Sequence, residues 1–182
     1  VIALTSAALS LDWSPNGNPE PGTGYEVWRD TQSGFVNPVK TAVSTSALPV
    51  NGLTSKTTYY FKVRSVNSAG AFSGFDDTLS TRTYPAPPGA VALSGTALGI
   101  SSVSWTWNDA GEEDGYRVVS PADGNISGVL AANVTSWPEI NLSTNTAYSR
   151  KATAFNISGF STSTPVTRYT LAAPPTGFIL TE

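Results

Sequence analysis

The stretch Leu9-Ser10-Leu11-Asp12-Trp13 alternates apolar and polar side chains, and Val103-Ser104-Trp105-Thr106-Trp107 repeats that alternation 94 residues later. A period of two is typical of a β-strand with one buried face. Tyr25-Glu26-Val27 also returns, as Tyr116-Arg117-Val118, after 91 residues. The same order of markers at nearly the same spacing predicts two copies of one unit of about 90 residues.

Further markers extend the repeat towards the end of each copy. Four residues recur at a spacing of 89: Leu53, Tyr59, Asn67 and Gly70 return as Leu142, Tyr148, Asn156 and Gly159. Ser and Thr make up 46 of the 182 residues, and these side chains favour strands and turns over helix interiors. No run has a period of 3.6, so the sequence predicts an all-β chain.

The composition excludes several classes of function. Without Cys or His, the chain has no disulfide, thiolate or imidazole metal site, and it lacks the usual general base. Only 13% of residues are charged and the net charge is -3, so nucleic acid and anionic membrane surfaces are not expected partners. The apolar runs are far shorter than the ~20 residues that cross a bilayer, which predicts no membrane insertion. We expect no cofactor.

Each unit resembles a fibronectin type III domain, and the resemblance covers essentially the whole chain. It is carried by a Trp ending the second strand, a Tyr in the third, and a Leu-x5-Tyr element before the sixth. These residues are Trp13, Tyr25, Leu53 and Tyr59, then Trp107, Tyr116, Leu142 and Tyr148. The sixth strand reads Tyr59-x-Phe61-x-Val63-x-Ser65-x-Asn67, as in that family, and Asn16–Val27 is similar to bacterial surface versions of the module.

The resemblance implies two consecutive immunoglobulin-like, seven-stranded β-sandwiches, with Tyr59 and Tyr148 as tyrosine corners. We expect fibronectin type III domain 1 at 1–84, domain 2 at 85–173, and the first strand of a truncated third repeat at 174–182. The prolines of Tyr84-Pro85-Ala86-Pro87-Pro88 predict a semi-rigid joint between the two domains.

The second copy departs from the pattern in its core, where three positions shrink or turn polar. Arg150 stands where Phe61 packs, and Ala152 stands where Val63 packs. Trp105, opposite the smaller Leu11, can refill part of the lost volume. Because an unpaired buried guanidinium is costly, we expect Arg150 to reach an edge of the sandwich and meet a carboxylate.

The candidate interaction face lies on the first domain. If Tyr25 and Val27 face inward, the resemblance places Trp28, Tyr60, Lys62 and Arg64 together on one outer face. Aromatic residues beside Arg are typical of recognition patches. The alternative is cross-strand packing, with the Lys and Arg stems lying over the rings.

The acidic loops are the remaining candidates for chemistry. Glu112-Glu113-Asp114 and Asp76-Asp77 lack the facing geometry of a glycosidase pair, so no catalytic residues are expected. Either loop could contribute to calcium binding, but solvated charges are the simpler interpretation. Four Asn-x-Ser/Thr sequons, at Asn125, Asn133, Asn141 and Asn156, are about what chance gives.

Residues 174–182 contain an apolar run, Phe178-Ile179-Leu180, without a sandwich of its own. We expect it to dock on the second domain, or to add to a neighbouring molecule as a strand and so allow self-association.

The sequence favours a non-enzymatic spacer and interaction module of an extracellular, secreted or cell-surface protein, bacterial in origin, whose partners are neighbouring repeats of the same polypeptide. Two alternatives stay open. One is an adhesin or carbohydrate-binding accessory module that uses the Trp28 face for a protein or glycan ligand. The other is a surface filament assembled by strand addition.

Overall fold

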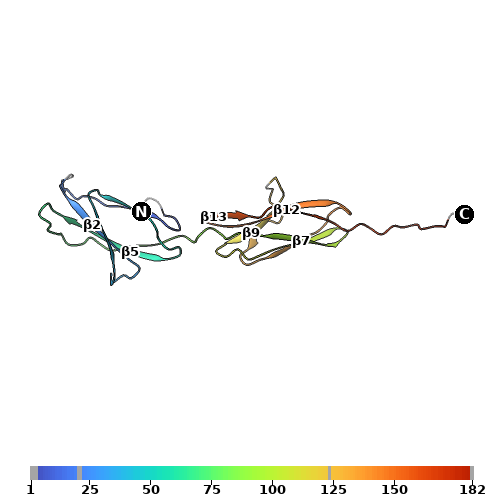
Figure 1. The fold of residues 1–182 in the computed structure, drawn as a ribbon, viewed down its shortest axis with the longest axis horizontal. Helices are drawn as coiled ribbons and strands as arrows, with labels where there is room; N and C mark the ends of the chain where they lie inside the picture. The colour runs from blue at the N-terminus through green and yellow to red at the C-terminus, as the bar shows by residue number, and fades with distance from the viewer. Residues whose placement is uncertain (1–3, 20–21, 123, 181–182) are drawn as a thin grey trace. The chain divides into compact units, whose positions relative to one another are not determined.

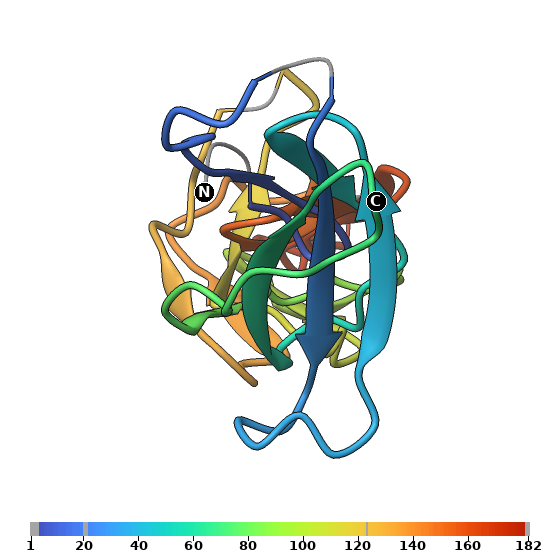
Figure 2. The ribbon, with the colours of Figure 1, turned by 90° about the vertical axis from the view of Figure 1, so that its left-hand side faces the viewer.

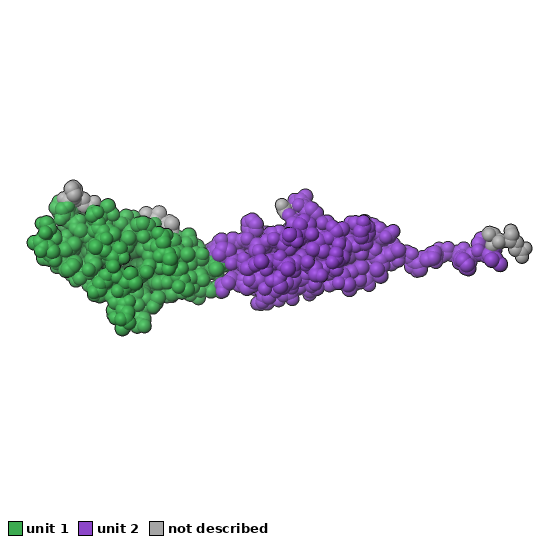
Figure 3. Space-filling model, viewed as in Figure 1, with its two compact units in different colours: residues 1–86 green, residues 87–182 purple. Residues whose placement is uncertain are grey.

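The computed structural model describes residues 4–19, 22–122 and 124–180. Every regular element in these ranges is a β-strand, so the prediction of an all-β chain is confirmed (Figure 1). Contacts divide the chain into two compact units, Val1–Ala86 and Pro87–Glu182 (Figure 3). No helix long and apolar enough to cross a membrane occurs in the described ranges. Residues 1–3 and 181–182, at the ends of two predicted strands, lie outside them.

The first unit is a two-sheet antiparallel sandwich. Its strands are β1 (Leu9–Asp12), β2 (Gly24–Asp30), β3 (Val39–Val43), β4 (Ala47–Val50), β5 (Thr58–Val66) and β6 (Leu79–Arg82). One sheet pairs β1 with β4, and the other has the order β3-β2-β5-β6. Figure 2 shows β2 between β3 and β5. Alternate residues of β1, β2 and β5 point between the sheets, as the period of two predicts.

The core of the first unit is apolar. Its buried members are Leu9, Leu11, Val27, Val50, Leu53, Tyr59 and Phe61. Trp13 packs at the end of this core and meets the ring of Tyr25 edge-on, with centroids 5.3 Å apart. The alternation of polar and apolar residues predicts Leu9, Leu11, Tyr59 and Phe61 as inward positions, and the structure confirms them; the burial of Val50 was not predicted.

The second unit repeats the arrangement. Its strands are β7 (Leu93–Gly99), β8 (Ser102–Trp107), β9 (Gly115–Val119), β10 (Leu130–Ala131), β11 (Ser136–Glu139), β12 (Ala147–Asn156), β13 (Gly159–Thr162) and β14 (Val166–Tyr169). One sheet has the order β11-β8-β7. In the other, β9 lies between β10 and β12, and the long β12 pairs with β13 at one end and with β14 at the other.

The core of the second unit contains a buried ion pair. Arg150 donates from Nε to Oε2 of Glu139 at 3.0 Å, and their side chains are only 13% and 10% exposed. The same Oε2 accepts the indole N–H of Trp105 at 2.8 Å, and Trp105 is fully buried. The expectation that Arg150 meets a carboxylate is confirmed, since Glu139 ends the edge strand β11.

Both units close with the same tyrosine contact. The Tyr59 hydroxyl accepts the Thr54 N–H at 2.9 Å, and the Tyr148 hydroxyl accepts the Ser143 N–H at 2.8 Å. Each bond spans five residues and satisfies a backbone donor just upstream of the tyrosine. This is the geometry of a tyrosine corner.

Candidate functional site

Strand register places the four predicted interaction residues on one face of the first unit. The pairing of β2 with β5 sets Glu26 opposite Arg64, Trp28 opposite Lys62, and Asp30 opposite Tyr60. The neighbouring positions Tyr25, Val27, Tyr59 and Phe61 are buried between the sheets, so the even-numbered positions face outward.

Trp28 is the centre of a packed aromatic and cationic group on this face. We call it the Trp28 cluster, and its members are Glu26, Trp28, Phe35, Lys40, Lys62, Arg64, Phe72 and Phe75. The ammonium groups of Lys40 and Lys62 lie 4.3 and 4.5 Å from the Trp28 ring centroid. The ring of Phe75 meets the indole edge-on, with centroids 4.8 Å apart.

Arg64 connects the inner rings of the cluster with the exposed ring of Phe72. Its guanidinium carbon lies 3.7 Å from the ring centroid of Phe72, which is 49% exposed, and 4.7 Å from that of Phe75. Lys62 also lies 4.2 Å from the centroid of Phe35, which is only 8% exposed. Each such contact contributes about 0.5–1 kcal/mol at a partly exposed site. The cluster therefore forms a small second core outside the sandwich.

One carboxylate balances this charge. Glu26 Oε1 accepts the indole N–H of Trp28 at 2.6 Å and two N–H groups of Arg64 at 2.9 and 2.7 Å. Burial raises the pKa of Glu26, but these hydrogen bonds and the nearby charges of Arg64 and Lys40 outweigh it, so the pKa lies below its ordinary value. Glu26 is therefore ionised at neutral pH and holds Trp28 and Arg64 in register.

The indole N–H of Trp28 is thus hydrogen-bonded within its own unit, and its ring packs against side chains of the same unit. These contacts are the ones that cross-strand packing requires. Tyr60 shares the face, but no contact joins its ring to Trp28 among the described residues. The surface that this face offers to a partner is the rim formed by Lys40, Arg64 and Phe72.

A polar depression adjoins this rim. It has a volume of about 600 Å³ and lies between Trp13–Asn18 on one side and Val63–Asp76 on the other, with Arg64 and Phe75 in its wall. The indole N–H of Trp13, which also lines it, is buried and has no hydrogen-bond partner among the described residues. No sequence pattern had pointed to this depression, because loops far apart in the chain form it.

The acidic loops have structural contacts. Glu113 is 9% exposed, and its Oε1 accepts the Asn133 N–H at 3.1 Å. Asp109, just before this loop, accepts the Gly111 N–H at 3.2 Å and the Tyr116 hydroxyl at 3.1 Å. Burial and these neighbours raise the pKa of Tyr116 to about 12, so its hydroxyl remains a donor. Among the described residues, no three acidic side chains gather closely enough to hold a metal ion.

The C-terminal segment corrects one expectation. Its described part, residues 174–180, forms no strand, and Phe178, Ile179 and Leu180 are 101%, 75% and 90% exposed. Docking of this segment on the second unit is therefore wrong for these residues. The physical reason lies in the backbone of the segment: Pro174 and Pro175 lack the N–H donors that a strand ladder needs, and Gly177 has a φ of 74°, which is not extended.

Sequence reasoning missed a pair of buried threonines. The Thr83 hydroxyl donates to the Thr54 carbonyl at 2.6 Å and accepts the Thr57 N–H at 3.0 Å. Thr170 makes the equivalent two bonds in the second unit, and both threonines are 3% exposed. Their recurrence after 87 residues was a usable signal, but it is hidden among 46 Ser and Thr residues.

The first unit, with two antiparallel sheets and a tyrosine corner, is an immunoglobulin-like β-sandwich. The family model described as fibronectin type III domain matches residues 1–78, and this unit belongs to that family. The second unit has the same all-β fold, with the same inner strand pairing of β9 with β12 and the same corner.

Curated relatives match larger parts of the chain. Endoglucanase B of Cellulomonas fimi is 29% identical over 190 aligned residues, which cover 96% of this chain and 18% of that protein. Chitinase Chi52 of Paenibacillus xylanexedens is 33% identical over 98 residues, which cover 51% of this chain and again 18% of that protein. The chain thus spans less than a fifth of either relative. A solved structure of chicken CNTN1 FN1–FN3 domains is 21% identical and covers 92% of this chain and 61% of that chain, with a TM-score of 0.42.

Proposed function

We propose that the chain is a non-catalytic spacer and interaction module of a larger secreted or cell-surface bacterial protein. The observation that carries this proposal is the family match over residues 1–78, together with relatives of which the chain spans under a fifth. A module that recurs as a minor part of large enzymes separates or positions other domains more plausibly than it performs their chemistry.

The chemistry of the described residues supports a mechanical role. The buried acid Glu139 is held in place by Arg150 and Trp105. Glu26 is bound to Trp28 and Arg64. A general acid or base needs a side chain that is free to exchange a proton with a substrate, and these carboxylates are committed to the fold.

The same relatives support an extracellular location. An endoglucanase and a chitinase act on polysaccharides, which are too large to cross a membrane, so these enzymes work where their polymers are. A module of this kind, without Cys, also keeps its fold without disulfides in an oxidising environment.

The spacer proposal is tested by a fusion. The chain is placed between a cellulase catalytic module and a cellulose-binding module, and compared with a direct fusion and with a Gly/Ser linker of 182 residues. We expect the chain to raise activity on insoluble cellulose above both controls while leaving activity on a soluble substrate unchanged. Equal activity of the chain and the flexible linker on insoluble cellulose would refute a spacer role.

A recognition role at the Trp28 face is favoured by one feature, the exposed Phe72 stacked under Arg64 beside the polar depression. Under this alternative, the isolated chain binds a glycan or protein on an array. Phe72→Ala then abolishes the signal, while Phe160→Ala, which removes a more exposed ring from the second unit, leaves it unchanged. Trp28→Ala weakens binding as well, but it also removes the centre of the cluster. The absence of any array signal, or equal loss with both variants, would remove this alternative.

A filament role is favoured by the exposed run Phe178-Ile179-Leu180. Under this alternative, the segment adds as a strand to another copy, and the chain elutes as a concentration-dependent oligomer on size exclusion. Ile179→Pro, which removes a donor that strand pairing needs, restores the monomer. A monomer at every concentration tested rules this role out.

A further inference from the structure

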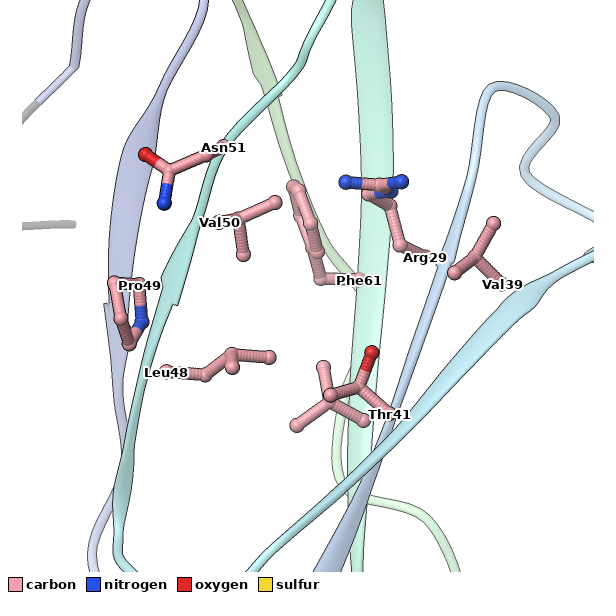
Figure 4. Close-up of a pocket in the computed structure, with 9 residues that line it drawn as sticks. Arg29, Val39, Thr41, Leu48, Pro49, Val50, Asn51 and Phe61 are labelled. Atoms are coloured by element: carbon pink, nitrogen blue, oxygen red, sulfur yellow. The ribbon is translucent and has the colours of Figure 1, made fainter.

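The open edge of the first sandwich contains a cavity between the two sheets. It has a volume of about 190 Å³ and is walled by β2, β3 and β5 on one side and by β4 on the other (Figure 4). Among the described residues, β3 pairs only with β2 and β4 only with β1, so no backbone ladder closes this edge. The floor is apolar, with the ring of Phe61 and the side chains of Leu48 and Val50.

One cation faces this apolar space. Arg29 follows the inward positions Tyr25 and Val27 on β2, and its side chain is half-buried in the wall of the cavity. Its guanidinium carbon lies 5.8 Å from the centroid of the corner residue Tyr59. Within the described part of the chain, no carboxylate forms an ion pair with it.

The second unit also holds a guanidinium near its corner tyrosine. Arg150, on β12 at the position of Phe61, lies 5.3 Å from the ring of Tyr148. There it meets the carboxylate of Glu139 and, through it, the indole of Trp105. The corresponding residues of the first unit are Val50 and Leu11, which are smaller and carry no charge.

The guanidinium near the corner tyrosine is therefore paired in one unit and unpaired in the other. In the second unit, Arg150 meets the carboxylate of Glu139. In the first unit, Arg29 has no carboxylate partner among the described residues and lines a cavity with apolar walls. A partly buried guanidinium gains most from a carboxylate, because charge-assisted bonds are strongest where water is excluded.

We propose that this cavity binds a small ligand with a single aromatic ring and one carboxylate, the carboxylate on Arg29 and the ring against Phe61, Val50 and Leu48. The size is consistent, since an apolar cavity of about 150 Å³ accepts benzene. Asn51 and Thr41, at the mouth, supply polar groups for a ring substituent. This proposal is independent of the spacer role, and the failure of either leaves the other unchanged.

The test is a titration of the 182-residue chain with benzoate, followed by amide chemical shifts. Benzyl alcohol serves as the uncharged ligand and acetate as the ligand without a ring. We expect benzoate to bind with a Kd of roughly 1 mM and to shift the amides of β2, β4 and Phe61. Benzyl alcohol and acetate should each bind at least about tenfold more weakly, which corresponds to the loss of one charge-assisted contact or of the ring burial.

Two variants assign the effect to the cavity. Arg29→Gln should weaken benzoate about tenfold. Val50→Glu places a carboxylate where the second unit has Glu139, so it should pair with Arg29 and abolish binding. Arg117→Gln, which removes a guanidinium from the outer face of the second unit, should change nothing. The dispersion of the amide spectrum shows whether each variant is folded, and either cavity variant alone decides the outcome.

Three results would overturn the proposal. The first is equal affinity for benzoate and benzyl alcohol. The second is a benzoate affinity that survives Arg29→Gln or Val50→Glu in folded protein. The third is a site that accepts only polypeptide, in which an acidic peptide shifts the amides along the whole length of β3 or β4 while benzoate shifts none.

Discussion

The two units build the same corner of the sandwich from opposite kinds of side chain. In the first unit, Leu11, Val50 and Phe61 form an apolar group. At the corresponding positions of the second unit, Trp105, Glu139 and Arg150 form a buried polar group. The backbone arrangement around them is shared, including the tyrosine corner. One fold therefore accepts either solution, provided that the three positions agree with one another.

The difference shows that the residues at these three positions depend on one another and have to change together. Arg150 alone would bring an uncompensated charge into the core, and Glu139 alone would do the same. Together they neutralise each other, and the Trp105 indole fills the volume and donates to Glu139. A buried pair of this kind contributes little more than apolar residues of similar volume, but the loss of one partner is expensive.

The largest expected effect comes from breaking this pair. Glu139→Gln keeps the shape but leaves the Arg150 charge unpaired, so we expect the second unit to lose about 3–5 kcal/mol. The combined change Glu139→Val, Arg150→Phe and Trp105→Leu recreates the first unit's set and should restore most of that loss. Denaturant unfolding monitored by amide exchange of β8 and β1 separates the two units. If Glu139→Gln alone were as stable as the triple variant, the three positions would not depend on one another.

The next largest effect on stability is expected at Gly95, whose missing side chain leaves space for the ring of Trp105. Gly95 lies opposite Trp105 in the β7–β8 pair, and a Cβ at this position would come within 2.7 Å of the indole ring. We expect Gly95→Ala to cost the second unit about 1–3 kcal/mol through overpacking. In a Trp105→Leu background the cost should largely vanish. Thermal unfolding of the single and double variants measures this coupling, and additive effects would argue against it.

The tyrosine corner is the feature that the units share, so its loss should affect them equally. Tyr59→Phe and Tyr148→Phe each leave one backbone N–H without its acceptor, at Thr54 and at Ser143. We expect each to cost its own unit about 1–2 kcal/mol. Unit-specific amide exchange is the measurement. Losses of stability that differ by more than about 1 kcal/mol would show that the residues of the core alter the strength of the tyrosine corner.

The smallest effect is the pH dependence that Glu26 gives to the stability of the first unit. Because the pKa of Glu26 is lowered in the fold, its carboxylate stabilises that unit above its ordinary pKa of 4.5, and the contribution is lost as the pH falls below that value. Glu26→Gln should cost about 1 kcal/mol at pH 7 and close to nothing at pH 3. Stability curves against pH for both proteins test this, and a cost that stays constant from pH 7 to 3 would contradict it.

Much of the fold could be predicted because the repeat shows each strand twice. The alternation of β1, β5 and their counterparts fixed the inward residues, and Trp13 and Trp107 marked the same strand end. Arg150, a charged residue at a core position, also predicted a nearby carboxylate, because a buried guanidinium without a partner is costly. A sequence shows both the alternation of a strand and a charged residue at a position where the repeat predicts a buried side chain.

The partner itself could not be predicted. Glu139 follows a Pro in a short edge strand, and nothing in that stretch distinguishes it from a surface acid. The same holds for Arg29, whose inward position follows from the alternation of β2 but whose cavity depends on β3 and β4 remaining unpaired. Such features arise from the distance between strands, which a one-dimensional pattern does not contain.

The hydrogen bond from the Tyr84 N–H to the Thr5 carbonyl, 3.1 Å long, ties the last residues of the first unit to its first ones. Tension applied along the polypeptide would therefore meet this link before it reached the core, with the Thr83 hydroxyl bonds beside it. Resistance to pulling then depends on how fast these few bonds yield, a kinetic quantity that equilibrium stability does not report. Under the proposed spacer role, these bonds would set how long the first unit withstands a pulling force.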